Sequence, residues 1–150
     1  MVGGRWSKVG DPVLYTSSSP ELAMNEIMAH LDNVPYELLP KLNLVTISYK
    51  QCRPRVYRAA DLPDGWNAPN YDDPASWALM PSTHTHPQTI LHNWLHRPRS
   101  LAVAVPSVIM PKTFNYLFHG RHPNFAKLEV VGIEPLIIDR RLWKRGTLVS

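Results

Sequence analysis

Gly3-Gly4-Arg5-Trp6-Ser7-Lys8 opens a stretch that continues to Glu26 and organises the rest of the chain. The two glycines allow backbone angles that other residues resist, so a ligand or a second segment can approach closely. Arg5 adds a planar cation whose fork of donors fits a phosphate or a carboxylate. The opening therefore combines close backbone approach with a cation suited to an anionic group.

A strand and a helix follow this turn. Val13-Leu14-Tyr15-Thr16 alternates in a β-rich run and predicts a strand. Ser18-Ser19-Pro20-Glu21 predicts a helix start, because it offers a serine cap, a proline in the first turn and an acid near the N-terminus. We expect the helix to run from about Glu21 to Leu31. Its apolar stripe comprises Ala23, Met24, Ile27, Met28 and Leu31. Glu26 lies at the edge of that stripe, so we expect its carboxylate to be half-buried and held in a fixed direction.

The totals of the chain limit its class. A length of 150 residues suits one domain. The lone Cys52 excludes an internal disulfide, which suits a reducing cytosol. No apolar run approaches a membrane span, and we expect no signal peptide before Gly3. The formal charge of +4 favours anionic ligands without singling out nucleic acid, and fifteen prolines favour an α+β layout with long loops over a helical bundle.

Four further segments predict strands. Leu44–Tyr49 is β-branched and mostly apolar. Leu101–Val105 is a continuous apolar run, which indicates a buried central strand closed by Pro106. Leu128–Ile133 and Leu136–Asp139 predict two more strands, with a turn at Glu134-Pro135 between them.

The other segments are a helix and loops. Pro87–His96 predicts a short helix with Ile90, Leu91, Trp94 and Leu95 on one side. Residues 51–70 are loop-rich, and Trp66 is expected to plug an edge of the core. Residues 71–74 carry turn chemistry, and residues 144–150 predict a loose tail.

Taken in order, these pieces resemble the RES domain, a family named for an arginine, a glutamate and a serine. The resemblance begins with Gly3-Gly4-Arg5-Trp6, Leu14-Tyr15-Thr16 and Ser19-Pro20-Glu21-Leu22-Ala23-(x)2-Glu26, and its serine landmark is Val105-Pro106-Ser107. Further agreements are Asp61-Leu62-Pro63-(x)2-Trp66, Asn93-Trp94-Leu95, Asn115-Tyr116-Leu117, His122-Pro123 and Asp139-Arg140-Arg141-Leu142. Each piece is weak alone, but the ordered set covers almost the whole chain and is fairly specific.

The resemblance implies an ADP-ribosyltransferase-like α+β fold, with a mixed or split β-sheet and surrounding helices in one domain over residues 1–150. It implies the toxin of a bacterial toxin–antitoxin pair that consumes NAD⁺ by cleaving the nicotinamide–ribose bond, with water or phosphate as acceptor. Two alternatives stay open, namely ADP-ribosyl transfer to a protein and an inactive subunit that only binds the antitoxin or nucleic acid.

The partner that the resemblance implies is an Xre-like helix-turn-helix antitoxin. We therefore expect a hetero-oligomer in the cytoplasm, with a homodimer as a further option. Nucleic acid would be reached only through the antitoxin, and no membrane is involved.

The resemblance also implies site residues. Catalytic roles fall to Glu26, Arg5, Tyr15 and Ser107, and NAD⁺ contacts to Gly4, Arg5, Trp6, Lys8, Tyr15 and Ser107. A fixed carboxylate can stabilise positive charge that develops on ribose. Arg5 can hold a pyrophosphate bidentately, Tyr15 can offer a ring face and a hydroxyl, and Ser107 can position a ribose or amide group. If the resemblance is set aside, the residues are better interpreted as structural. Arg5 and Glu26 would form an ion pair, Tyr15 would belong to the core and Ser107 would be a turn residue.

The chain departs from the family pattern at Ser7, at Leu91-His92 and at His119-Gly120, where other residues are usual. Most RES domains also carry a segment before Gly-Gly-Arg-Trp that contributes a strand. Because this chain starts almost on the motif, we expect an open sheet edge there. Such an edge predicts self-association, or stabilisation by a partner that covers it.

Two groups of residues suggest other chemistry. His84-Thr85-His86 and His92-(x)3-His96 invite a zinc site, but structural zinc usually takes four ligands with thiolates, and Cys52 is the only thiol. We therefore expect no metal. The second group is a set of basic residues that could suggest nucleic-acid binding. No DNA-binding motif accompanies it, so solvated faces or an acidic partner surface explain it better. The group comprises Arg53, Arg55, Arg58, Arg140, Arg141, Lys144 and Arg145.

Overall fold

The structure, a computed structural model, describes residues 4–31, 34–50, 53–68 and 86–143. Its strands are β1 (Val13–Ser17), β2 (Leu42–Ser48), β3 (Arg55–Val56), β4 (Ala102–Pro106), β5 (Phe114–His119) and β6 (Glu129–Leu136). Its helices are α1 (Pro20–His30), α3 (Pro87–Ile90) and α4 (His92–His96), with 3₁₀ turns at Tyr36–Leu38, Ala59–Asp61, Phe125–Lys127 and Arg140–Trp143. The protein is therefore a single domain of mixed α/β type with two sheets and a few short helices.

The strands form two separate sheets. The larger sheet has the order β1-β5-β4-β3, in which β5 is antiparallel to both neighbours and β3 runs parallel to β4. The smaller sheet is an antiparallel ribbon of β2 and β6, with a register shift between Thr46 and Ile47. Two sheets, the larger of them mixed, agree with the expectation of a mixed or split β-sheet.

The core lies on one face of the larger sheet. Strand β4 is buried along its whole length, as its continuous apolar run predicted. Its inward residues Val103 and Val105 share a cluster with Leu117 of β5 and with six side chains beyond the sheet, which are Trp6, Leu62, Trp66, Leu91, Trp94 and Leu95. Trp66, predicted to plug the core, is 7% exposed and stacks on Trp6 with ring centroids 6.1 Å apart.

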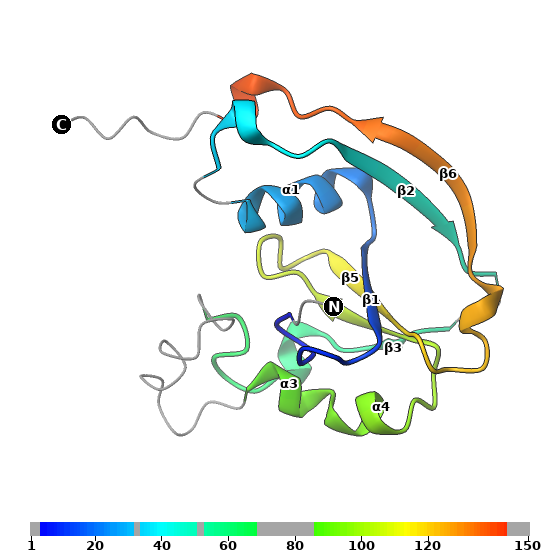
Figure 1. Ribbon diagram of the computed structural model, residues 1–150. Coiled ribbons are helices and arrows are strands. Elements are labelled where there is room, and N and C mark those ends of the chain that lie inside the picture. Colours follow the sequence, from blue (N-terminus) through cyan, green and yellow to red (C-terminus); the bar gives the residue numbers. More distant parts are fainter. Residues whose placement is uncertain (1–3, 32–33, 51–52, 69–85, 144–150) are drawn as a thin grey trace.

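The opposite face of the larger sheet meets the end of β2. The Tyr49 ring lies 6.1 Å from the Tyr116 ring and 5.4 Å from the Phe118 ring. In Figure 1 the β2–β6 ribbon arches over α1 and the larger sheet, while α3 and α4 lie below the sheet. Helix α1 continues from the end of β1, so its residues are carried to that end of the larger sheet.

Helix α1 begins as its sequence predicted. The Ser19 side chain accepts a hydrogen bond from the Leu22 backbone N–H at 3.2 Å, and Pro20 follows the cap. The predicted apolar stripe is half-buried, and the buried residue of the helix is Leu22, which was not assigned to that stripe. Glu26 is half-buried, as expected.

Three local predictions differ from the structure. The predicted helix Pro87–His96 is divided at Leu91 into α3 and α4, although Leu91, Trp94 and Leu95 are buried as expected. The predicted division into strands Leu128–Ile133 and Leu136–Asp139 by a turn at Glu134-Pro135 is wrong, because β6 runs through both turn residues, ends at Leu136, and pairs Pro135 with Asn43. Proline is tolerated at this position because β6 is an edge strand with one unpaired side. Strand β5 was not predicted at all.

Several predictions fall outside the described residues, namely those for Gly3, Cys52, residues 71–74, His84 and residues 144–150. Within the described ranges, no helix is long and apolar enough to cross a membrane.

Candidate functional site

Glu26 of α1 reaches the corner where β4 ends and β5 begins. Its Oε1 accepts a hydrogen bond from Ser107 Oγ at 2.9 Å and another from Asn115 Nδ2 at 2.6 Å. Its Oε2 has no hydrogen-bond partner among the described residues. One oxygen is thus fixed by two neutral donors, and the other is left to accept a bond from outside this network.

Ser107 is fully buried and uses its whole hydrogen-bonding capacity. Its hydroxyl donates to Glu26 and accepts from the backbone N–H groups of Ile109, at 3.2 Å, and Met110, at 3.1 Å. A hydroxyl carries one donor and two acceptor lone pairs, so no further bond is available. Ser107 therefore ties the turn after β4 to the Glu26 carboxylate.

Asn115 connects Glu26 to strand β1. Its Oδ1 accepts a hydrogen bond from Ser17 Oγ at 2.9 Å, which leaves Nδ2 oriented toward Glu26. Ser17 and Asn115 are directly opposite each other in the β1–β5 pairing. Because side chains two residues apart share one face of a strand, Tyr15 lies on the same face as Ser17, one step along β1.

The opening motif forms a tight turn against Tyr15. The backbone N–H groups of Gly4 and Ser7 donate to each other's carbonyls at 2.9 and 3.2 Å. Gln88 of α3 donates to both carbonyl oxygens, at 3.1 Å to Gly4 and 3.2 Å to Ser7. A Cβ on Gly4 would lie 3.0 Å from Tyr15 Oη, so this glycine is what lets the turn close on the ring.

The Tyr15 hydroxyl is held by the same turn. It forms a 2.9 Å hydrogen bond with Ser7 Oγ and accepts one from the Trp6 backbone N–H at 3.3 Å. The side chain of Tyr15 is still 40% exposed, while Trp6 is 3% exposed. Tyr15 can therefore present part of its ring to solvent, and Trp6 contributes its side chain to the core.

Arg5 and Lys8 complete the predicted set. Arg5 Nη1 donates to the backbone carbonyl of Ala68 at 3.0 Å and to that of Trp66 at 3.4 Å. Lys8 is exposed, and its backbone N–H donates to Asp11 at 2.7 Å. Arg5 is half-buried beside the segment that precedes residue 69.

The structure thus brings five of the seven predicted residues into two neighbouring groups, which leave out Arg5 and Lys8. Glu26 and Ser107 are in direct contact, and Gly4, Trp6 and Tyr15 meet at the N-terminal turn. The alternative of an Arg5–Glu26 ion pair does not match these contacts, since the described partners of Glu26 are both neutral.

Three contributing residues were missed as site residues. Asn115 belongs to one of the motifs shared with the RES domain, and Ser17 lies two residues after Tyr15, on the same strand face. Both residues could therefore have been predicted from the sequence. Nothing in the sequence indicates the role of Gln88, because its contacts with the turn join residues more than eighty positions apart.

The histidines gather no third ligand within the described part of the chain. His92 and His96 lie 4.1 Å apart by ring centroids, and His96 Nδ1 is 2.8 Å from the His92 carbonyl oxygen. No cluster of three or more His, Cys, Asp or Glu side chains occurs among the described residues. The absence of a metal remains a prediction.

Comparison with known proteins matches residues 1–140 to the RES domain. This chain belongs to the RES family. It is 33% identical over 145 residues to Toxin Res of Pseudomonas putida, covering 95% of this chain and 87% of that protein. It is 30% identical to Toxin Res of Photorhabdus laumondii, over 96% of this chain and 84% of that protein. A more distant member, the Prs ADP-ribosylating toxin of a Sphingobium species, is 25% identical over 97% of this chain and 84% of its own length.

Proposed function

We propose that this RES protein is an enzymatic toxin that cleaves the bond between nicotinamide and ribose in NAD⁺. The proposal rests on family membership, on relatives named Toxin Res and Prs ADP-ribosylating toxin, and on the geometry of Glu26. It also assigns the chain an ADP-ribosyltransferase-like fold. The sheet that is mixed and split into two parts supports this assignment.

The observation that carries the proposal is the asymmetric environment of the Glu26 carboxylate. Cleavage of a glycosidic bond develops positive charge on the sugar, and a fixed negative group lowers its energy. Two donors hold Oε1 in place before any substrate arrives, and Oε2 stays available to face the ribose or accept one of its hydroxyls. Such preorganisation is what makes a carboxylate effective in the transition state.

The other residues have supporting roles. Ser107 and Asn115 position Glu26 and do not touch substrate themselves, because the Ser107 hydroxyl is saturated and Asn115 is occupied by Glu26 and Ser17. Tyr15 offers its exposed ring portion to the nicotinamide. Arg5 contacts the pyrophosphate, with Gly4 and Lys8 nearby in sequence, and Trp6 supports the turn from the core.

The bonds balance without a cofactor. The nicotinamide–ribose bond breaks, and nicotinamide leaves with the bonding electron pair. A water oxygen then bonds to the ribose carbon and loses its proton to solvent, giving ADP-ribose. With phosphate as acceptor, a phosphate oxygen forms that bond and the product is a phosphorylated ADP-ribose.

A second reaction is ADP-ribosyl transfer to a protein side chain. The name of the Sphingobium relative favours it. The same Glu26 would then stabilise the same ribosyl cation, and only the acceptor would differ. As partner we propose an Xre-like helix-turn-helix antitoxin in the cytoplasm, which would restrain the toxin in a hetero-oligomer.

The decisive experiment incubates the purified chain with NAD⁺ in phosphate and in phosphate-free buffer and separates the products by chromatography. We expect nicotinamide release in the wild type and its loss in Glu26→Gln, which keeps the shape of the side chain and removes the charge. Glu21→Gln is the matched control, because Glu21 is an exposed acid on the same helix.

The products separate the candidate functions. Free ADP-ribose identifies water as the acceptor, and a phosphorylated product identifies phosphate. Label from NAD⁺ that appears on protein only when a lysate is added identifies protein transfer. No consumption of NAD⁺ under any of these conditions would leave only a binding subunit and would overturn the proposal.

A further inference from the structure

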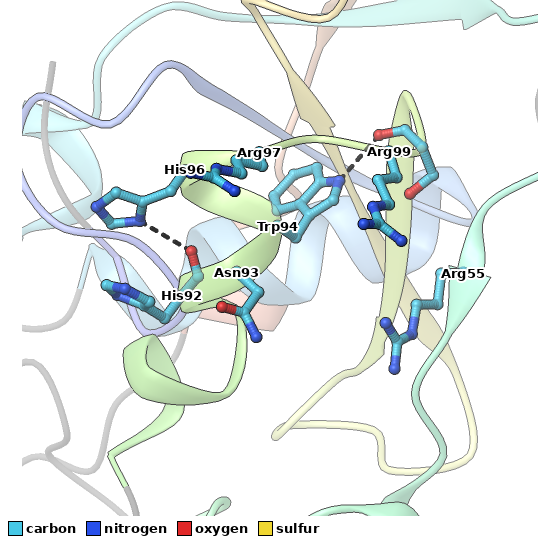
Figure 2. Close-up of a pocket in the computed structure, with 8 residues that line it drawn as sticks. Arg55, His92, Asn93, Trp94, His96, Arg97 and Arg99 are labelled. Carbon is cyan, nitrogen blue, oxygen red and sulfur yellow. Dashed lines mark hydrogen bonds between the residues drawn. The ribbon is translucent and has the colours of Figure 1, made fainter.

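A hollow lies at the amino ends of β3 and β4, away from Glu26. Its volume is about 690 Å³, and it is lined by Arg55, His92, Asn93, Trp94, His96, Arg97, Arg99 and Ser100. Three of these residues are arginines and two are histidines, and none of these lining residues is an acid. Figure 2 shows Arg55 and Arg99 on one side of α4 and the two histidines on the other.

Within the described part of the chain, the arginines of this basic pocket form no ion pair with a carboxylate. The ion pairs among the described residues join Arg140 to Glu37 and Arg141 to Asp139, far along the chain. Arginine stays charged at any physiological pH, so three positive charges line one hollow. Their mutual repulsion is relieved when an anion binds between them.

The pocket is also held in shape. Trp94 Nε1 donates to the Ser100 carbonyl at 2.9 Å, and the Arg97 backbone N–H donates to the Asn93 carbonyl at 2.9 Å. The Arg55 guanidinium lies over the Tyr57 ring, 4.9 Å from its centroid. A ligand therefore meets a loop and an arginine that are already oriented, which lowers the entropy cost of binding.

We infer that this pocket binds a diphosphate group, at a site separate from the one around Glu26. Ser100 precedes β4 and Ser107 follows it, so the two sites lie at opposite ends of that strand. At a rise of about 3.3 Å per residue the separation is roughly 20 Å. The inference therefore does not depend on the proposed reaction at Glu26.

The chemistry of the lining selects the ligand. Guanidinium groups bind phosphate oxygens bidentately, and Arg55 and Arg99 come from separate elements to the same side of the pocket. The volume falls within the range of about 300–1,000 Å³ common for small-molecule sites, and three of the eight lining residues are arginines. A compact, multiply charged anion fits this combination, and its source is either free pyrophosphate or a nucleoside diphosphate.

The test titrates inorganic pyrophosphate into the full chain by calorimetry. We expect saturable binding that weakens at least about tenfold in Arg99→Gln and in Arg55→Gln, since each removes one bidentate donor. Lys41→Gln lowers the net charge by the same unit at an exposed position outside the pocket and should keep the wild-type affinity. Melting curves check that each variant is folded.

Two further ligands, ADP and a single-stranded oligonucleotide, show where the diphosphate comes from and test whether the pocket binds nucleic acid instead. ADP that binds more tightly than pyrophosphate identifies a nucleoside diphosphate, and equal affinity identifies the free anion; both support the inference. If Arg99→Gln and Lys41→Gln weaken pyrophosphate binding equally, the binding depends only on the net charge of the protein, and the inference is overturned. Binding of a single-stranded oligonucleotide without any binding of pyrophosphate also overturns it, in favour of a nucleic-acid surface.

Discussion

Asn115 Nδ2 and Glu26 Oε1 are joined by a 2.6 Å hydrogen bond, although the two residues are 89 positions apart in the chain. Asn115 is oriented in turn by Ser17, which lies opposite it across the β1–β5 pairing. The direction of the Glu26 carboxylate is thus set by the pairing of two strands that are far apart in the sequence.

This relationship predicts that Asn115→Leu lowers turnover of NAD⁺ without much change in KM. The leucine keeps the volume and removes one of the two donors on Oε1, a loss of about 1.5–3 kcal/mol for a hydrogen bond to a charged group. That corresponds to roughly a ten- to hundredfold fall in kcat, measured by nicotinamide release. Asn43→Leu, an exposed asparagine on β2, is the control. A rise in KM at constant kcat would contradict the positioning role.

Ser107→Ala should reduce both stability and turnover. The substitution leaves the backbone N–H groups of Ile109 and Met110 without their acceptor, at a cost of about 1–3 kcal/mol. Urea unfolding measures that loss. Ser17→Ala is the matched comparison, because Ser17 contacts the site only through Asn115 and should cost less stability. Equal effects of the two changes would show that the turn after β4 does not depend on the serine.

Arg5→Lys should not retain NAD⁺ affinity. Lysine offers a point charge in place of a planar fork, so neither bidentate contact with a pyrophosphate nor the paired bonds to Trp66 and Ala68 can be reproduced. Calorimetry with NAD⁺ on a catalytically silent Glu26→Gln background measures the affinity. If the Glu26→Gln protein binds NAD⁺ equally well with and without the Arg5→Lys substitution, Arg5 is reduced to a structural anchor for residues 66–68.

Gly4→Ala should destabilise the N-terminal turn. Its new Cβ would lie 3.0 Å from Tyr15 Oη and 3.1 Å from Tyr15 Cζ, so the ring or the turn must shift. We expect a loss of roughly 1–3 kcal/mol in urea unfolding, typical of overpacking. Gly132→Ala is the control, since the nearest atom to its added Cβ, on Thr46, is at an ordinary contact distance of 3.6 Å. Comparable losses at both positions would argue against a special role for Gly4.

Metal should be dispensable. Elemental analysis of protein purified without a tag should find no stoichiometric zinc, and a chelator should leave NAD⁺ turnover unchanged. His92 and His96 are the pair to test, because their rings lie 4.1 Å apart on α4. Zinc bound one-to-one by the wild type and lost on His92→Ala would reverse this prediction.

The sequence predicted the elements whose signals are local. Helix α1 carries its own cap in Ser19, and β4 is a bounded apolar run, so neither needs a distant partner to be recognised. Strand β5 was not predicted because its residues include the polar Asn115 and His119, which interrupt the alternation of apolar and polar residues expected of a strand. Likewise β6 passes through Pro135, a residue that locally indicates a turn.

The site was predictable in its residue types and not in its geometry. The resemblance supplied Glu26 and Ser107, but only pairing across the sheet puts Asn115 beside them. The saturation of the Ser107 hydroxyl depends on the turn at residues 109–110, and no spacing in the sequence indicates it.

The pairing of β1 with β5 and of β2 with β6 has a consequence for biosynthesis. Glu26 leaves the ribosome long before Asn115, and at roughly 5–20 residues per second the interval lasts about 4–18 seconds. For most of that time the carboxylate has neither of its donors, because Ser107 follows Glu26 by 81 residues. Since contacts between distant segments also fold slowly, the nascent chain cannot hold Glu26 in its final orientation until synthesis is almost finished. The antitoxin that we propose as partner would therefore need to act only on completed chains.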